Sequence, residues 1–238
     1  MIDYLTDPAH WTGKDGIWML LAEHLLYSFI ALIVACAIAI PLGLYIGYTR
    51  KGQFLVAGLA NALRALPTVG LLILMVMIIS PFFASRLAFV IPSLIVLVLL
   101  AVPPILTSTY AGIMAVDASA VDAAKGMGFR PMRVLTQVQI PCATPLILSG
   151  IRSSLLQIIS TATVAAYISL GGLGRLLIDG RAQNDYGQMA AGAVLVAALA
   201  LVFELGLGYL TKRVVSPGLS RRTVKERRRE TVGVPVPA

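Results

Sequence analysis

Residues 121–128 are Val-Asp-Ala-Ala-Lys-Gly-Met-Gly and, after nine further residues, residues 138–141 are Val-Gln-Ile-Pro. This stretch is polar and broken by glycines, and it interrupts an otherwise very apolar chain. The charges around it are too dense for the interior of a bilayer. They are Asp117, Asp122, Lys125, Arg130 and Arg133. We therefore expect a large intracellular loop with two short helices, held between membrane spans and suited to docking a soluble partner.

The composition of the chain predicts an integral membrane protein with one membrane domain. Its 238 residues are 58% hydrophobic and only 13% charged, and the mean hydropathy is +0.87. A soluble domain of this length needs far more charge to cover its surface. The formal charge of +8 lies mostly in loops and in the tail, so membrane topology explains it better than nucleic-acid binding.

Apolar runs of bilayer length predict five spans, a helical bundle and hence an all-α membrane fold. The runs cover about 25–48, 64–86, 87–113, 144–170 and 185–212. Pro67 falls in the first turns of the second run, where proline is best tolerated. The pair Pro103-Pro104 should kink the third. We expect residues 54–63 to form a short interfacial helix and residues 171–185 a polar re-entry loop, with Trp11 and Trp18 as interfacial anchors.

The basic residues orient these spans. Thirteen of the 19 Lys and Arg lie in the turn 50–51, the loop 114–140 and the tail, four lie on the other side, and Arg64 and Arg152 lie at span ends. The positive-inside rule then puts the N-terminus outside and the C-terminus in the cytoplasm of a bacterial inner or plasma membrane. We divide the chain into an interfacial lead-in (1–23), a transmembrane domain (24–213) with the loop 114–141, and a basic cytoplasmic tail (214–238).

The loop itself carries clear signals for short helices. Asp117 is a good N-cap for a helix over 118–125, and glycines follow that helix. Pro131 suits the first position of a second short helix, which Pro141 should end. Met127 and Phe129 are apolar residues at the corner, where a partner's groove would accept them. From the residues alone, two interpretations of this loop are equally supported: it docks to a partner, or it packs on the chain's own spans.

The spacing of this loop resembles the EAA signature of permease subunits of binding-protein-dependent ABC importers. That signature has Glu-Ala-Ala, three residues, Gly, nine residues and Ile-x-Leu-Pro. Here Asp122 replaces the glutamate, and Val138 and Ile140 replace the isoleucine and the leucine. The resemblance implies a type I, MetI-like transmembrane domain whose loop inserts into a cytoplasmic ATPase. The coupling residues it implies are Asp122, Ala123, Ala124, Gly126, Met127, Gly128, Phe129 and Pro141.

The resemblance extends over roughly residues 20–212. Within the family, the chain looks like the osmoprotectant branch, which imports glycine betaine, carnitine, choline and related quaternary amines. The motifs are Arg64-Ala-Leu-Pro67, Ser108-Thr-Tyr110-Ala-Gly112, Gly150-Ile-Arg152 and Gly171-Gly-Leu-Gly174. It implies two ATPase subunits that carry ATP and Mg, a second permease (the same or a related chain), a separate extracellular binding protein, and no cofactor or catalytic residue on this chain. As translocation-pathway or gate residues we take Arg64, Pro67, Thr109, Tyr110, Gly171, Gly172, Gly174 and Glu204.

Glu204 lies inside an expected span, where an ionisable residue is a functional candidate by default. It either pairs with a basic or polar group between helices, which we favour, or attracts a cationic solute. Arg152 is either an anchor at the start of its helix or an ion-pair partner. His10 and His24 have no companions that would make a metal site, and Cys36 and Cys142 are read as small buried hydrophobes.

Other classes of function make different predictions. A permease for another small polar solute, such as an amino acid, would share the loop but differ in the pathway. A stand-alone channel or secondary transporter would show an inverted repeat and need no partner, and we find no repeat in the sequence. A membrane scaffold would show no ATP-dependent uptake.

Overall fold

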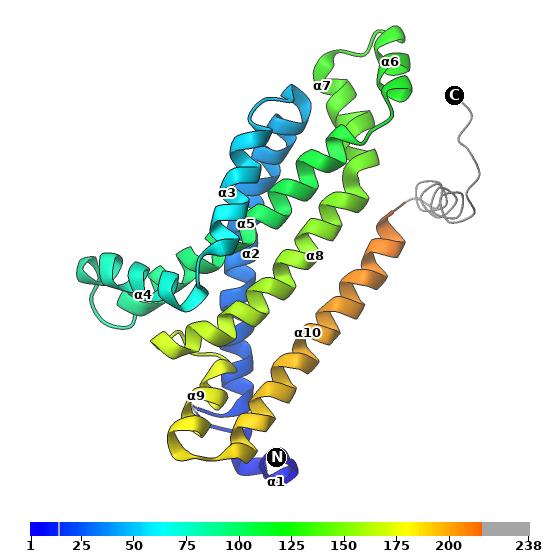
Figure 1. Cartoon of the computed structure of the whole chain (residues 1–238). Coiled ribbons are helices and arrows are strands. Elements are labelled where there is room, and N and C mark those ends of the chain that lie inside the picture. Colours follow the sequence, from blue (N-terminus) through cyan, green and yellow to red (C-terminus); the bar gives the residue numbers. More distant parts are fainter. Residues whose placement is uncertain (14, 216–238) are drawn as a thin grey trace, which may run out of the picture.

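Four long helices carry most of the apolar runs. A computed structural model describes residues 1–13 and 15–215, apart from the side chains at positions 55, 57, 59, 61 and 64. Within these residues, the helices long and apolar enough to cross a bilayer begin with α2 (Ile17–Thr49) and α5 (Leu87–Met114). The others are α8 (Ile140–Ala165), which is continuous with shorter helical segments at both of its ends, and α10 (Tyr186–Val214). Figure 1 shows them side by side.

Helix α2 begins earlier than expected and ends at a turn with two left-handed residues. We expected the span to start at about Leu25, because Glu23 is charged, but the helix already starts at Ile17. At the other end Arg50 has a left-handed backbone (φ 57) and Gly52 follows with φ 83, so the chain reverses there. Residues 17–23, predicted to be part of the lead-in, therefore belong to the first long helix.

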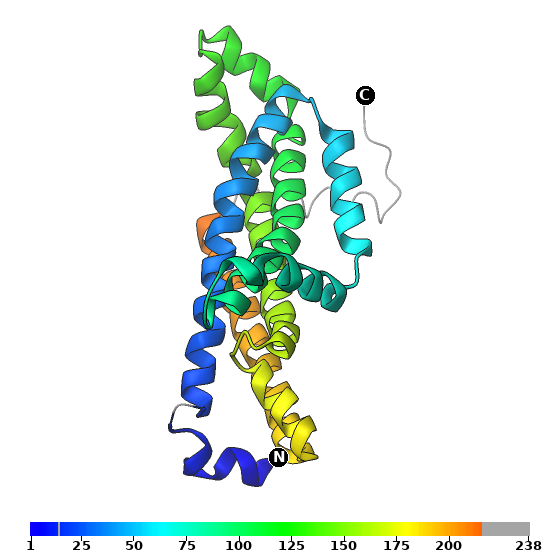
Figure 2. The same cartoon turned by 90° about the vertical axis from the view of Figure 1, so that its left-hand side faces the viewer.

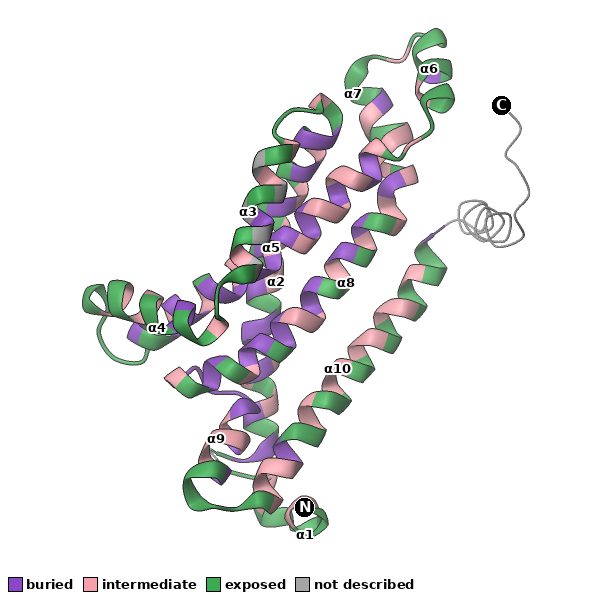
Figure 3. Ribbon diagram, viewed as in Figure 1, coloured by how far each residue is buried: buried purple, intermediate pink, exposed green. Residues whose placement is uncertain are grey.

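The core lies where α2, α5 and α8 meet, and it is built on small residues. Ala31, Ala35 and Ala39 are fully buried at four-residue intervals along α2, and Gly43 continues the stripe. A Cβ built on Gly43 would lie 2.6 Å from the Cβ of Thr109 on α5. Small residues at such spacing let membrane helices approach closely. Figure 3 shows buried residues along α2, α5 and α8, whereas α10 is mostly exposed or half-buried.

The second expected span is broken into two short helices. Helix α3 (Gln53–Ala65) ends before Leu66 and Pro67, which have extended backbones, and α4 (Thr68–Ile79) follows, with the 3₁₀ turn η2 (Ser80–Phe82) after it. A residue before proline avoids the α conformation, so the chain bends there. Pro67 is thus the N-cap of α4, not a residue of its first turns. Helix α4 has 12 residues, about 18 Å, which is too short to span a bilayer.

The orientations of these two short helices reverse the expectation from the sequence. Figures 1 and 2 show α3 along the long axis of the bundle and α4 crossing that axis. We expected residues 54–63 to lie in the interface and the following run to span. Apolar character alone does not distinguish a crossing helix from a transverse one, so the turn at Leu66 and Pro67 decides the arrangement.

The end of the bundle that holds the N-terminus is folded. It contains α1 (Ile2–Thr6), the 3₁₀ turn η1 (Pro8–His10) and α9 (Gly174–Gln183), with η4 (Ala166–Ile168) at the end of α8. Buried residues Ile17, Leu20, Leu173 and Leu176 pack there against α1 and α10. The re-entry loop predicted for 171–185 is therefore largely helix, because its leucines find this small core. Asn184, with φ 57, ends α9.

At the opposite end of the bundle α6 (Ala118–Gly126) and α7 (Pro131–Val134) form a corner. The second short helix does not end at Pro141 as predicted. Helix α7 passes into a π turn, η3 (Leu135–Gln139), and directly into α8, of which Pro141 is one of the first residues. Proline is tolerated in the first turn of a helix, and the chain stays helical through Pro141 as it does through Pro145. The predicted tail 214–238 lies outside the described residues beyond Val215.

Candidate functional site

Residues 117–134 form the α6–α7 corner, and hydrogen bonds fix both ends of α6 within it. Asp117 is the N-cap of α6, as predicted, and its Oδ1 accepts a hydrogen bond from the Ser119 backbone N–H (3.0 Å). At the other end Gly128 has φ +82, and its N–H donates to the carbonyl of Lys125 at 2.9 Å. Phe129 N–H donates to the carbonyl of Ala124 at 3.1 Å. Glycine adopts this left-handed conformation without strain, so Gly128 sets the sharp turn.

This corner has a buried inner face and an outer face on which two exposed methionines lie among charged residues. Ala124 and Val134 are each only 2% exposed, which fixes α6 against the start of the following helix. Met127 and Met132 are 70% and 69% exposed. Methionine is flexible and polarisable, and it is common on surfaces that accept a partner. Asp122 is exposed and pairs with Lys125 within the same helix (Nζ–Oδ1 3.1 Å).

The other predicted coupling residues lie near these positions. Ala123 and Gly126 are exposed on α6, and Phe129 is half-buried after the turn. Pro141 is exposed at the start of α8, two residues after the π turn. The structure thus brings the predicted coupling residues of 122–129 together in one corner, with Pro141 behind it on the helix that leaves the corner.

The predicted pathway residues do not form one group. Thr109 is fully buried in the contact between α5 and α2, and its hydroxyl donates to the Ile105 carbonyl at 2.7 Å. Tyr110 is half-buried and packs against the main core. Pro67 is exposed at the turn between α3 and α4. The side chain of Arg64 lies outside the described residues.

The three predicted loop glycines form a tight turn between α8 and α9. Gly171 and Gly172 have φ 96 and 76, in the region that glycine alone adopts freely. A Cβ on Gly174 would clash with the backbone carbonyl of Thr163. The Gly172 N–H donates a hydrogen bond to Oε2 of Glu23 on α2 at 3.2 Å. The turn is thus packed tightly against the first long helix.

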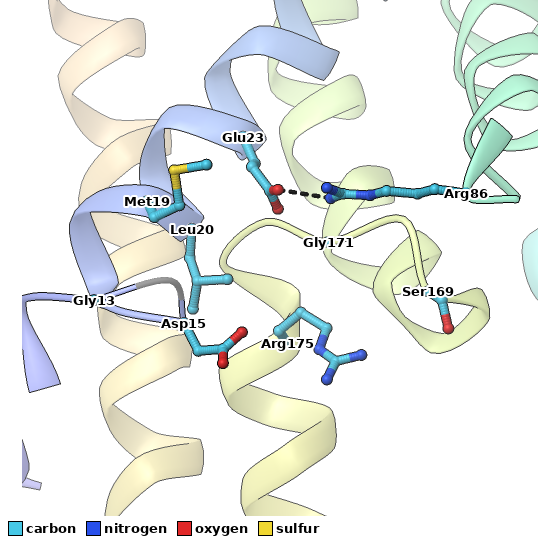
Figure 4. A pocket seen from close by; sticks show the side chains of 9 residues that line it. All are labelled: Gly13, Asp15, Met19, Leu20, Glu23, Arg86, Ser169, Gly171 and Arg175. Carbon is cyan, nitrogen blue, oxygen red and sulfur yellow. Dashed lines mark hydrogen bonds and ion pairs between the residues drawn. The ribbon is translucent and has the colours of Figure 1, made fainter.

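Glu23 also forms an ion pair that the sequence did not reveal. Arg86 donates from Nη2 to Oε1 of Glu23 at 2.6 Å, across 63 residues of sequence. The hydrogen bond to Glu23 raises the pKa of the Arg86 guanidinium above its usual value. Figure 4 shows the pair at the edge of a cavity of about 750 Å³, which Met19, Leu20 and Arg175 also line. The only sequence signal was that both residues border uncharged runs.

A second ion pair joins α8 to α10 within the spans. Arg152 donates from Nε to Oε2 of Glu204 at 2.7 Å, and from Nη2 to Oε1. The two side chains are 35% and 36% exposed. The carboxylate and the guanidinium thus satisfy each other in a two-point contact. The sequence offered both an ion-pair role for Arg152 and a pairing role for Glu204, and the structure brings these two residues together.

The two histidines make separate local contacts. The His10 ring stacks on Tyr4 at 3.9 Å and bonds the Tyr4 carbonyl. His24 is buried, and its Nε2 lies 3.1 Å from the carbonyl of Ile159. Trp11, which we predicted as an anchor, donates its indole N–H to Leu5 and packs against Trp18 at 5.1 Å.

Long apolar helices that end in an exposed two-helix corner are typical of a membrane-embedded protein. Residues 39–216 match the family described as "Binding-protein-dependent transport system inner membrane component". The chain belongs to this family. It is therefore a component of a transporter and lies in a membrane.

Named relatives cover most of this chain. The choline transport system permease protein OpuBB of Bacillus subtilis is 31% identical over 199 residues, which is 84% of this chain and 88% of the relative. The glycine betaine/carnitine/choline permease protein OpuCB of the same organism is 32% identical over 83% of this chain and 88% of its own length. The carnitine transport permease protein OpuCB of Listeria monocytogenes is 32% identical over 81% and 85%.

Solved structures support the fold. The MetNI methionine ABC transporter in inward-facing conformations matches with a TM-score of 0.70 and 21% identity, covering 89% of this chain and all of the solved chain. A second crystal form of it gives a TM-score of 0.72. The all-helical, MetI-like architecture predicted from the sequence is confirmed.

Proposed function

We propose that this chain is the permease subunit of an ATP-driven importer for osmoprotectants such as glycine betaine, carnitine, choline and proline betaine. Family membership supports the transport role. The solute class rests on the named relatives, which are choline, carnitine and glycine betaine permeases. ATP hydrolysis would occur on a partner subunit that carries ATP and Mg.

The single observation that carries this function is the α6–α7 corner. It presents Met127 and Met132 to a partner while Ala124 and Val134 hold it rigid. It also continues without a break into α8. A push on the corner is therefore delivered to a helix that crosses the whole bundle. A loop that only packed on its own spans would bury these methionines.

The proposed partners follow from this arrangement. Two cytoplasmic ATPases would bind the α6–α7 corners of two permease chains, and an extracellular binding protein would deliver the solute at the opposite end. The corner would lie in the cytoplasm and the N-terminus outside. The distribution of basic residues supports this orientation, and Figure 1 places the N-terminus and the α6–α7 corner at opposite ends.

Solute-stimulated ATP hydrolysis tests this function. The permease is reconstituted with its ATPase and binding protein, and glycine betaine, carnitine, choline and proline betaine are compared with a panel of amino acids. We expect the quaternary amines to stimulate hydrolysis and ATP-dependent uptake into vesicles. Stimulation by amino acids alone would assign another solute class. Uptake without the ATPase would indicate a channel or secondary transporter.

A further inference from the structure

The carboxylate of Glu23 joins three separate segments at the end of the bundle that holds the N-terminus. Glu23 projects from α2, and its Oε1 accepts from Arg86, the residue directly before α5. Its Oε2 accepts from the backbone N–H of Gly172, between α8 and α9. The Glu23 side chain is only 14% exposed. Hydrogen bonds to a shielded carboxylate are stronger than those between neutral groups.

The neighbouring residue strengthens the same junction. The Nε2–H of His24 donates to the Ile159 carbonyl of α8 at 3.1 Å. A Cβ built on Gly172 would lie 3.0 Å from the His24 Nδ1, and one on Gly171 would collide with the Glu23 carboxylate. The glycine turn therefore lies directly against α2, with no room for side chains.

This junction is mechanically connected to the α6–α7 corner. One helical stretch runs over the 38 residues Pro131–Ile168, a length of about 57 Å at the usual rise. The turn that contains Gly172 follows directly after this stretch. A displacement of the corner along or around this helix would pull on the hydrogen bond between Gly172 and Glu23.

We propose that Glu23, through Arg86 and Gly172, is a latch that holds this end of the bundle closed and releases in each transport cycle. Here the Glu23 latch means these two contacts. Because it concerns solute entry, the proposal rests on the proposed function. The cavity beside the latch is bounded by α2 and by the turn, so release would widen it between these elements. Glu23 acts as a positioning residue, since it closes the end without needing to touch the solute.

Weakening the latch should favour the released state. The loss of an interaction made only in the closed state raises the population of the released state. If release and ATP hydrolysis are coupled, ATPase activity without solute should rise by about fivefold, the lower end of typical coupling strengths. A residue with only a folding role would lower activity instead.

The test compares Glu23→Gln with Asp179→Asn in the assembled permease–ATPase complex. The Arg175–Asp179 pair (3.1 Å) lies at the same end but within α9 alone, so it joins no separate segments. We expect higher ATPase activity without solute for Glu23→Gln and Arg86→Gln, and wild-type activity for Asp179→Asn. The double variant Glu23→Arg with Arg86→Glu restores the ion pair with its charges exchanged. Its ATPase activity without solute should fall from the level of the single variants only part of the way toward the wild type, because the hydrogen bond from Gly172 is not remade.

A second readout needs neither solute nor ATP. Leu20 lines the cavity and is 6% exposed. In a background of Cys36→Ala and Cys142→Ala, Leu20→Cys should react faster with a membrane-impermeant maleimide when Glu23 is Gln. Unchanged labelling and unchanged hydrolysis would overturn the latch, even if the solutes are as proposed. Conversely, the absence of osmoprotectant uptake by the wild type would remove the solute assignment but leave both latch readouts valid.

Arg86→Gln keeps the test decisive if Glu23→Gln fails to fold. The Arg86 side chain is 58% exposed, so its replacement should be tolerated. Faster labelling in Arg86→Gln that is absent in Arg86→Lys supports the latch, because lysine keeps a positive charge beside Glu23 and leaves Glu23 itself unchanged. Equally fast labelling in both variants refutes it, because the effect then comes from damage and not from the ion pair.

Discussion

Arg152 on α8 and Glu204 on α10 form a two-point ion pair across 52 residues of sequence. Helix α10 lies at the side of the bundle (Figure 1), so this pair is one of the attachments that hold it to α8. Lone charges within spans are costly, and pairing offsets part of that cost. The pair therefore favours a structural role for Glu204 over the attraction of a cationic solute.

Replacement of Glu204 by Gln separates these roles. The variant keeps the shape of the side chain but leaves the Arg152 guanidinium without a counter-charge. We expect a lower apparent melting temperature of the purified protein and an unchanged ratio of apparent affinities for choline and glycine betaine. The double variant with Arg152→Gln should recover part of the stability. A change in the solute ratio at normal protein level would place Glu204 in the pathway.

Replacement of Gly128 by Val should uncouple hydrolysis from transport. The left-handed backbone at this position costs other residues about 1–2 kcal/mol, and a β-branched residue more. We expect normal insertion into the membrane but loss of solute-stimulated ATP hydrolysis. Gly58→Val is the matched control, because Gly58 lies in a helix with open space around it. Normal uptake by the Gly128 variant would remove the coupling role of the corner.

Replacement of Gly43 by Val tests the close contact of α2 and α5. The new Cβ would lie 2.6 Å from the Cβ of Thr109, so the two helices must separate. Overpacking of this kind costs about 1–3 kcal/mol. We expect a clear fall in thermal stability, measured by unfolding in detergent. Gly206→Val on α10 meets no neighbouring atom and should be neutral; equal stability of the two variants would contradict the packing argument.

Cysteine labelling tests the proposed orientation. Gln183 at the end of α9 and Gln137 in the π turn are both exposed, so a difference in their reactivity reports the side of the membrane. With Cys36 and Cys142 replaced by Ala, an impermeant maleimide should label Gln183→Cys in intact cells but not Gln137→Cys. Permeabilised cells should label both. The opposite pattern would reverse the orientation and, with it, the docking of the ATPase.

The sequence predicted the long helices well because uncharged runs of bilayer length have few alternatives. It placed the start of α2 too late, since Glu23 was taken as a boundary. A charge is tolerated there because Arg86 and Gly172 satisfy it. It also predicted the turn at Gly128 correctly, because glycine and cap signals are local.

The errors came from effects that local patterns do not contain. Hydropathy does not show that the chain turns at Pro67, which sends α4 across the bundle. Proline is taken as a helix end from sequence, but Pro141 lies in the first turn of α8, where it is tolerated, and Pro145 and the pair Pro103-Pro104 also lie inside helices. The two ion pairs join residues 52 and 63 positions apart, so only the tertiary fold could reveal their partners.

The π turn over Leu135–Gln139 also sets an angular relation. A π turn accommodates one residue more than the α-helix would, and each residue of an α-helix turns the chain by about 100°. Everything before Leu135, including Met127 and Met132, is therefore rotated by about this angle relative to its place on an uninterrupted α-helix of the same sequence. Deletion of one residue here would convert the π turn to an α turn and leave Met127 and Met132 facing as they do now. Replacement of the π turn by α-helix at constant length would instead turn both side chains by about 100° about the axis of α8. The direction in which the α6–α7 corner faces thus depends on this one turn being π.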